Sequence, residues 1–449
     1  MTTKSELRWL GAVLLLALGL RLLAFWLTQE TPFAGDERDY FARAAGFARG
    51  GGISPIGGRP PAMEVVFGSA FRVFGTSPDV ARLVNAVIGS LAVVPLYAVG
   101  RRLGGVGCAR VAACIAAGYP SFVAFAVGLW SEPLYIAVAM TGLAFLLSGL
   151  PVTARALAGG VCLGASVLVR ESGLAVPLAA AAWWLFFQEG AWSRRVRAPA
   201  LLLAGVAVVV VPWTIHINAS GQPFALVGRT TWQNLYIGNA PAAERLGADG
   251  EVERVEPRLH YYELGEGRLE SEAAARMLAL DAIAARMPTW PFEKLASELP
   301  AFFAPTSFTQ QRLLTRPESR RGEWAYRFRI GAIEGRTFRV WAAVIVALVY
   351  AGVAIAGTAG LLLALPGRGP ALLLFFVAAQ LAPCVLAFAS SRFRLPGMTA
   401  LAVGVGLLWV HRRRPGEAGW PRTLALVGAA VVAALLAWQA PTALSPLWG

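Results

Sequence analysis

The sequence predicts an all-α, polytopic membrane protein with about 11 transmembrane helices. Of its 449 residues, 57% are hydrophobic and only 15% are charged, and the mean hydropathy is +0.58. A soluble globular domain carries about 25% charged residues. Apolar runs of about 20 residues, the length that crosses a bilayer, recur along the chain. Basic residues gather at the ends of alternate runs, as insertion into a membrane requires.

The apolar runs set the expected spans. They lie near residues 9–28, 80–100, 107–126, 133–150, 153–169, 172–187, 199–217, 340–364, 370–389, 395–411 and 423–440. The stretch 107–187 holds four short runs joined by tight turns, and the number of spans is least well defined there. The first run contains Arg21 and has no small-residue cleavage site before Glu30, which indicates a retained anchor rather than a signal peptide.

Charge gives the expected orientation. The chain has 40 basic and 26 acidic residues and a net charge of +14, but the stretch from Asn218 to Phe338 holds fifteen of each. The excess therefore lies at the ends of the apolar runs and reports membrane insertion rather than nucleic-acid binding. With the N-terminus inside, the inner segments hold fourteen basic and three acidic residues. We expect a multi-pass protein of the bacterial inner (plasma) membrane, with a cytoplasmic N-terminus and no nucleic-acid partner.

Two outer segments are long enough to carry structure of their own. The expected parts are an N-terminal membrane module (1–217) with a first outer loop at 29–79, an extracytoplasmic loop (218–338) and C-terminal transmembrane helices (339–449). Capped or amphipathic patterns in the two loops predict helices over Asp36–Arg49, Ala62–Phe74, Glu270–Met287 and Phe292–Phe303. We expect these helices to lie against the membrane.

Polar side chains gather where the outer loops meet the spans, a place where ionisable residues are candidates for function. The clusters are Gly35-Asp36-Glu37-Arg38-Asp39-Tyr40, Gly57-Gly58-Arg59-Pro60-Pro61, Trp130-Ser131-Glu132-Pro133-Leu134-Tyr135, Arg170-Glu171 and Ser391-Arg392-Phe393-Arg394-Leu395-Pro396. Arginine forks suit phosphate oxygens, and carboxylates suit proton transfer. Together the clusters predict an anion site that faces out of the membrane.

Each cluster also has a structural interpretation. Asp36 is well placed to cap the helix that follows it, and Arg59 can bind an ordinary anionic lipid. Arginines near span ends can also extend to lipid headgroups, although Arg170, Arg392 and Arg394 all lie on the side where topology disfavours them. If the segment that holds Arg392 and Arg394 is extended, both side chains point the same way.

Further polar residues give weaker signals. Asn234 and Asn239 are candidates for contacts with an acceptor or within the loop, although Gly-Asn is also ordinary turn chemistry. His216 and Glu64 are the candidate metal ligands, but a lone His at a span end is more often an interfacial polar residue. The sequence has neither a nucleotide-binding loop nor a zinc pattern. We therefore expect no required cofactor and leave a divalent metal open.

The order and placement of the clusters resemble those of the GT-C class of polytopic glycosyltransferases. The resemblance is to the group that contains the dolichyl-phosphate-mannose–protein mannosyltransferases and the bacterial aminoarabinose transferases, over most of 1–240 and again over 270–410. Its most specific parts are Asp36-Glu37-Arg38-Asp39-Tyr40 and Arg59-Pro60-Pro61, followed by Ser131-Glu132, Arg170-Glu171 and Arg392-Phe393-Arg394-Leu395-Pro396. Each motif is short, and their order is the more specific signal.

The resemblance implies roles for single residues. It places the acid of the reacting centre at Asp36, with Glu132 completing the cavity, and Glu37 and Glu132 stay candidates for a second catalytic acid. The residues expected to bind the lipid phosphate and donor are Arg59, Arg170, Arg392, Arg394 and Tyr40. Gly58 stands where some relatives have a metal-binding acid, which argues against a bound metal.

The expected activity is transfer of a sugar from a polyprenyl-phosphate donor to an acceptor hydroxyl on the extracytoplasmic face. Such a donor already carries a phosphate leaving group, so arginines that stabilise its charge and a carboxylate that accepts the hydroxyl proton are sufficient. The resemblance implies inversion at the anomeric carbon. The alternatives are a lipid-carrier flippase or transporter, and a surface-glycan polymerase or ligase. The expected partners are the polyprenyl-phosphate sugar, membrane lipids and a protein, lipid or glycan acceptor.

Overall fold

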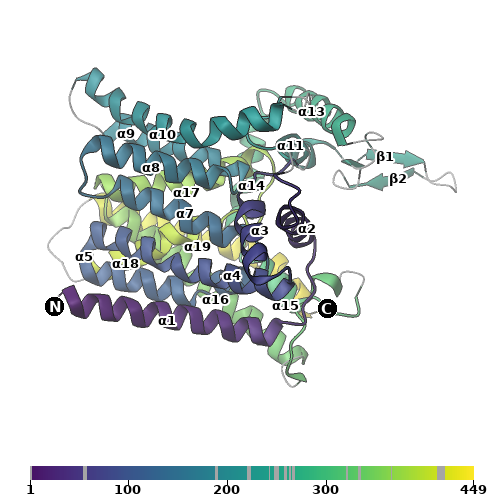
Figure 1. The fold of residues 1–449 in the computed structure, drawn as a ribbon, viewed down its shortest axis with the longest axis horizontal. Helices are drawn as coiled ribbons and strands as arrows, with labels where there is room; N and C mark the ends of the chain where they lie inside the picture. The colour runs from purple at the N-terminus through teal and green to yellow at the C-terminus, as the bar shows by residue number, and fades with distance from the viewer. Residues whose placement is uncertain are drawn as a thin grey trace.

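The chain forms a bundle of helices that run side by side, with the start of α1 at one end of the bundle and the finish of α19 at the other (Figure 1). The computed structural model describes residues 3–53, 58–187, 191–219, 224–241, 243–246, 252–256, 260–261, 264, 268–319, 322–331, 335–365, 367–411 and 420–448. Gly57 of the second cluster lies outside this description. So do Glu189, Arg412, Arg413, Arg414, Glu417 and the side chain of Arg194, which are among the seventeen charged residues of the expected inner segments.

The bundle confirms the predicted all-α polytopic fold. Its helices are α1 (Thr3–Thr28), α4 (Pro78–Leu91), α5 (Val93–Gly118), α6 (Pro120–Ala126), α7 (Glu132–Leu146), α8 (Val152–Val167), α9 (Ala175–Phe187), α10 (Trp192–Asn218), α16 (Arg336–Leu363), α17 (Arg368–Leu386), α18 (Gly397–His411) and α19 (Trp420–Trp448). Within the described residues, six helical stretches are long and apolar enough to cross a membrane, and four shorter apolar helices accompany them. The number of eleven spans stays a prediction.

The chain reverses direction inside α5. Gly104 and Gly105 leave the helical region, and Gly105 has a φ of 71°. Beyond this break Ala109 packs back on Gly100, where an added Cβ would lie 2.9 Å from the Cα of Ala109. Only glycine allows two backbones to approach so closely. The apolar runs predicted at 80–100 and 107–126 are therefore two helices joined by a tight turn.

Arg21, the charge inside the first expected span, is buried in α1 with 1% of its surface exposed. Its guanidinium donates to the carbonyls of Ala17 (3.0 Å), Ala116 (3.2 Å) and Ala117 (3.1 Å). Ala116 and Ala117 belong to the last turn of α5, whose carbonyls have no following amides within the helix. Arg21 therefore caps a helix that ends inside the bundle, which explains a cation at this depth.

Short elements cover one end of the bundle (Figure 1). They are α2 (Asp36–Ala48), α3 (Ala62–Phe74), η1 (Glu171–Leu174), α11 (Thr231–Asn239), β1 (Ala243–Leu246), β2 (Val252–Val255), α13 (Arg268–Ala284), α14 (Trp290–Phe303), α15 (Phe308–Leu314) and η3 (Gly322–Trp324). The helices predicted in the two outer loops correspond to α2, α3, α13 and α14. The antiparallel pair β1–β2, in which Ala243 faces Val255, is an addition that the sequence pattern did not predict.

The segment that carries Arg59 is fixed at two points. Gly58 accepts a hydrogen bond from the backbone amide of Arg229 at 2.7 Å, and Ala62 donates its amide to the carbonyl of Leu168 at 3.0 Å. Between them the two prolines lead into α3, which begins at Ala62. Proline has no amide to leave unsatisfied at a helix start and holds φ near the helical value. Arg59 thus has a defined position at the end of the bundle.

Helix ends lie close to the expected limits of the long outer loop. α10 ends at Asn218 and α16 begins at Arg336. The division into 1–217, 218–338 and 339–449 itself stays a prediction.

Candidate active site

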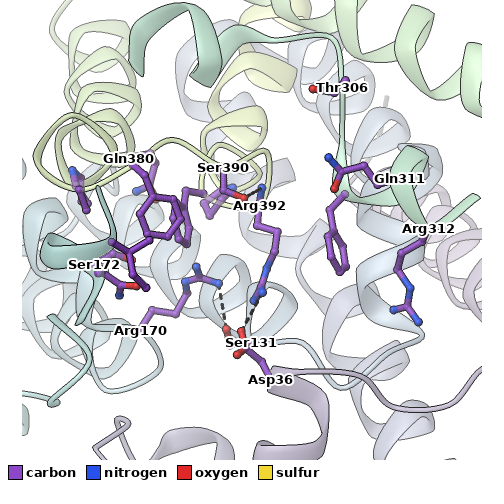
Figure 2. Close-up of a pocket in the computed structure, with 18 of the residues that line it drawn as sticks. Asp36, Ser131, Arg170, Ser172, Thr306, Gln311, Arg312, Gln380, Ser390 and Arg392 are labelled. Carbon is purple, nitrogen blue, oxygen red and sulfur yellow. Dashed lines mark hydrogen bonds and ion pairs between the residues drawn. The ribbon is translucent and has the colours of Figure 1, made fainter. Parts of the chain in front are cut away.

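A cavity of about 1240 Å³ opens at the end of the bundle that the short elements cover. Its wall is built from α2, η1, α11, α15, α16 and α17 and from the loops that precede α3 and follow α17. Figure 2 shows Asp36 and Arg170 close together, with Arg392 reaching towards them between Gln380 on one side and Gln311 on the other. Arg392 therefore lies in the middle of the lining side chains, between those of Gln380 and Gln311.

Asp36 is held between two arginines. Its Oδ1 accepts a hydrogen bond from Nη2 of Arg59 at 2.7 Å, and its Oδ2 accepts one from Nη1 of Arg392 at 2.9 Å. The side chain is 31% exposed, so it can be reached from the cavity. Burial would raise the pKa of Asp36, but the charges of Arg392 and Arg59 outweigh it and hold that pKa well below its ordinary value. Asp36 is therefore ionised at neutral pH.

Arg59 binds one face of α2. Its Nε lies 2.5 Å from Oδ2 of Asp39, and its Nη1 lies 3.4 Å from the hydroxyl of Tyr40. Its guanidinium carbon also lies 5.0 Å from the centre of the Tyr40 ring. Asp36, Asp39 and Tyr40 are three and four residues apart, so a helix presents them side by side. The order of residues in the first cluster is what allows one arginine to contact all three.

Glu132 lies behind this pair at the start of α7, fully buried. Its Oε1 is 2.5 Å from Nη1 of Arg170 and 3.1 Å from Nε of Arg392. Arg170 also donates to the hydroxyl of Ser131 at 3.1 Å. The second oxygen of Glu132, Oε2, has no hydrogen-bond partner in the described structure. Arg392 therefore joins two carboxylates, Glu132 through Nε and Asp36 through Nη1.

Arg392 is held in place by aromatic rings as well as by acids. Its guanidinium carbon lies 4.3 Å from the centre of the Trp130 ring and 5.7 Å from that of Phe308. These two rings contact each other edge to face at 5.0 Å. Burial would lower the pKa of Arg392, but the neighbouring Glu132 and Asp36 raise it above its ordinary value. The site thus presents a permanent, preorganised cation to the cavity.

Glu37, a candidate catalytic acid, does not line the cavity and is 1% exposed. Its Oε1 accepts the backbone amide of Leu129 at 3.0 Å, and its Oε2 accepts that of Ala34 at 3.3 Å. The same Oε2 lies 3.3 Å from Nη1 of the buried Arg312. A carboxylate bound in this way joins the segment 29–79 to the loop before α7 and to α15. The structure thus places Glu37 outside the cavity wall, and its role as a catalytic acid stays a prediction.

Arg394, a candidate donor ligand, also points elsewhere. It is 4% exposed and donates to the carbonyls of Phe302, Ala304 and Thr306. Arg392 and Arg394 would point the same way only if their segment were extended, and this condition is not met, because residues 391–396 form turns. The turn directs alternate side chains to different sides, so Arg394 fixes the segment after α14 while Arg392 enters the cavity.

The two candidate asparagines on α11 have different surroundings. Asn234 lines the cavity. Asn239 is buried, donates to Leu386 at 2.8 Å and accepts from Trp290 at 2.8 Å, so it joins α11 to its neighbours instead. The start of α11 is held by Glu171, whose carboxylate accepts the hydroxyls of Thr230 and Thr231 at 2.7 and 2.6 Å.

The candidate metal ligands do not come together. His216 contacts the carbonyl of Ile53 at 3.3 Å, and Glu64 pairs with Arg43 at 2.7 Å. Gly58 supplies no ligand where some relatives have an acid, and the nearby acids Asp36 and Glu132 already bind arginines. Within the described residues no group of three or more His, Cys, Asp or Glu side chains could hold an ion. The residues present do not fit a divalent metal.

Several lining residues had no signal in the sequence. Gln233, Gln311, Phe308 and Trp324 reach the cavity from the long outer loop, and Gln380 reaches it from α17. None belongs to a charged cluster at a span end, and the loop was neutral overall. Asp39 belongs to the cluster Asp36–Tyr40 but was not predicted as a site residue. Its position three residues after Asp36 puts the two on one helix face, and this spacing could have indicated that both contact Arg59.

The comparisons agree with the resemblance in the sequence. Residues 58–216, less than half of the chain, match the family described as dolichyl-phosphate-mannose-protein mannosyltransferase. Among curated proteins no sequence matches the chain.

Two solved structures of an oligosaccharyltransferase share the architecture, with TM-scores above 0.5. The archaeal oligosaccharyltransferase AglB from Archaeoglobus fulgidus, in complex with an inhibitory peptide and a dolichol-phosphate, is 15% identical with a TM-score of 0.52, over 98% of this chain and 55% of that one. The Archaeoglobus fulgidus oligosaccharyltransferase in complex with Zn and sulfate is also 15% identical with a TM-score of 0.52, over 96% and 52%. ArnT from Cupriavidus metallidurans bound to undecaprenyl phosphate gives 17% identity and a TM-score of 0.43, over 90% and 78%.

At these identities the similarity shows the fold, and the chain spans about half the length of the oligosaccharyltransferases it matches. The chain is a polytopic membrane protein with the fold of the GT-C class of glycosyltransferases, and its residues 58–216 match the dolichyl-phosphate-mannose–protein mannosyltransferases.

Proposed function

We propose that the protein transfers a sugar from a polyprenyl-phosphate donor to an acceptor hydroxyl. The observation that carries this proposal is the ionised Asp36, which is open to the cavity and flanked by Arg59 and Arg392. A carboxylate beside two guanidinium groups provides an acceptor for a proton and a binding site for a phosphate within one cavity. The matched family and the dolichol-phosphate bound to the similar AglB structure support the class of donor.

The wall of the cavity that α16 provides suits the lipid part of the donor. Ala343, Val344 and Ala347 of α16 line the cavity there, and α16 is one of the helices apolar enough to cross a membrane. Gln310 of α15 donates to the carbonyl of Ala343 at 2.9 Å, which joins this wall to the site. An apolar wall at membrane depth next to arginines accommodates a chain in lipid and a phosphate at the boundary.

In the proposed reaction the acceptor hydroxyl oxygen attacks the anomeric carbon and forms the new glycosidic bond. The bond from that carbon to the phosphate oxygen breaks, and its electron pair leaves with the polyprenyl phosphate. Arg59 and Arg392 stabilise the charge that grows on the phosphate. The hydroxyl proton passes to Asp36, whose two oxygens each accept one arginine hydrogen bond and keep a further lone pair for the proton.

We propose that the anomeric centre is inverted. Retention requires a second carboxylate as nucleophile, about 5 Å from the first. Glu132 is fully buried behind Arg392, Glu37 is bound to backbone amides, and Asp39 is paired with Arg59. Of these four acids only Asp36 lines the cavity, which supports a single displacement.

We further propose that the site faces the extracytoplasmic side of the bacterial inner membrane. The basic residues of the sequence gather at the opposite ends of the helices, where the cytoplasmic loops are expected. A protein, a lipid or a glycan can supply the acceptor hydroxyl, and the transferred sugar is a hexose or a pentose.

Asp36→Asn tests the proposal. Purified protein is given a polyprenyl-phosphate sugar, and sugar transfer or release is followed by mass spectrometry. We expect the variant to lose about 100-fold or more of the rate, because the amide cannot take the proton. Asp281→Asn, the same change at an exposed position on α13, serves as the control and should keep full activity. Equal rates for wild type and Asp36→Asn in folded protein contradict the proposal.

A further inference from the structure

We infer that Arg392 is a built-in cation that takes the place of a divalent metal between Asp36 and Glu132. The inference deepens the proposed function and rests on it for the activity readout. Its binding readout does not depend on any activity.

The geometry of the guanidinium carries the inference. Arg392 donates from Nη1 to Asp36 at 2.9 Å and from Nε to Glu132 at 3.1 Å. A divalent cation shared by two acids is contacted by one oxygen of each, and two nitrogens of a single arginine make those contacts here. Asp36 and Glu132 come from segments far apart in the sequence, so the cation also ties the first outer loop to the start of α7.

The position is rigid, as a cation built into the protein must be. Trp130 and Phe308 contact the guanidinium, and the turn at 391–396 fixes its backbone. Arg392 donates to described acids through Nε and Nη1 and not through Nη2, and it lines the cavity. Nη2 is therefore available to a phosphate oxygen, which gives Arg392 the ability of a metal ion to bridge acid and substrate.

The charges of the cluster leave no demand for a further cation. Asp36, Asp39 and Glu132 supply three negative charges, and Arg59, Arg170 and Arg392 supply three positive ones. Removal of one arginine leaves an excess negative charge beside carboxylate oxygens, including Oε2 of Glu132, which has no partner. Oxygen ligands with excess negative charge are what Mn²⁺ and Mg²⁺ select.

The test compares Arg392→Ala with Arg59→Ala, because each removes one positive charge from Asp36. Only Arg392→Ala vacates the place between the two carboxylates. Binding of Mn²⁺ to purified protein in detergent is measured by electron paramagnetic resonance. We expect Arg392→Ala to bind Mn²⁺, and wild type and Arg59→Ala to show none at the same concentration.

Activity is the second readout. We expect EDTA to leave the rate of wild-type transfer unchanged. Arg392→Ala should lose about 100-fold of that rate, because loss of one charge-stabilising group at a reacting centre costs about this factor. Added Mn²⁺ should raise the rate of Arg392→Ala by about 10-fold, because the ion replaces part of the lost charge. Mn²⁺ should not restore Arg59→Ala. Arg392→Gln is measured in parallel, so that unfolding of the alanine variant still leaves a result.

Wild-type binding of Mn²⁺ between Asp36 and Glu132, or loss of activity in EDTA that Mn²⁺ reverses, overturns the inference. Equal Mn²⁺ binding by the Arg392 and Arg59 variants overturns it too. If the binding results are as expected but wild type transfers no sugar, the proposed function fails and the assignment of Arg392 stands.

Discussion

Asp36, Asp39 and Glu132 share one arginine cluster but differ in how far the cavity reaches them. Glu132 is fully buried, whereas the side chains of Asp36 and Asp39 are 31% and 44% exposed. Asp36 alone of the three contacts both Arg59 and Arg392. A proton acceptor must be both ionised and accessible, which is why the chemistry is assigned to Asp36.

The arginines also set the pH range in which Asp36 works. Its pKa in the folded protein lies well below the value of about 3.9 in an unfolded chain. The stability that this ionised group contributes is therefore present above about pH 4 and is lost as pH falls through the lower, folded pKa. We expect no loss of kcat/KM from protonation of Asp36 between about pH 5 and 8.

A pH–rate profile of wild type and Arg392→Gln checks this expectation. Loss of one guanidinium lets the pKa of Asp36 rise, so the acid limb of the variant should move to higher pH. Identical acid limbs in the two proteins would show that the arginines do not control this carboxylate.

Gly35 directly precedes α2, and its close packing against Trp324 fixes where the helix begins and therefore where Asp36 lies. Gly35 has a φ of 52°, a region that suits glycine, and a Cβ there would lie 2.4 Å from Cη2 of Trp324. We expect Gly35→Ala to displace the start of α2 from Trp324 and to lower transfer activity by about 10-fold or more, since small misplacements of a reacting group are costly.

Gly50→Ala is the matched control at the other end of α2. Gly50 also has a positive φ, 93°, but a Cβ there would meet nothing within 4 Å. Both variants carry a backbone penalty of about 1 to 3 kcal/mol, which thermal unfolding measures. Transfer activity should be lower in Gly35→Ala than in Gly50→Ala. Equal activity in the two variants would show that the fit of Gly35 against Trp324 does not matter for the reaction.

Local signals predicted most elements but not the direction of every side chain. The proline pair before α3 and the glycines after α2 placed those helices well, because such residues act on their own few neighbours. The segment 391–396 ends at Pro396, but this residue does not tell where the side chains point, and Arg394 is directed by the three carbonyls that it binds near the end of α14. A contact between residues some 90 positions apart does not appear in a local pattern.

For the molecule as a whole, the bundle places its loops at two opposite ends. Ser319 is exposed in the segment between α15 and η3 at the covered end, and Ser148 follows α7, whose first residue Glu132 is at that covered end. We expect Ser319→Cys to react with a membrane-impermeant maleimide in intact spheroplasts. Ser148→Cys should react only after the membrane is opened.

Both variants are made in a chain without Cys108, Cys114, Cys162 and Cys384. Labelling is read by mass shift in a gel. The reverse pattern would place the site in the cytoplasm and would contradict the proposed orientation.

Composition and hydrophobic length by themselves determined that the chain is a helical membrane protein and which acids and arginines lie at the ends of its apolar runs. These follow from transfer of side chains out of water, a property of each short segment. Tertiary structure decided which of those charges meet: Arg392 reaches Asp36 and Glu132, while Glu37, Arg394 and Asn239 bind backbone or structural partners. The reason is that every buried charge and amide must find a partner, and the partner is fixed by the packing of distant segments rather than by neighbours in sequence.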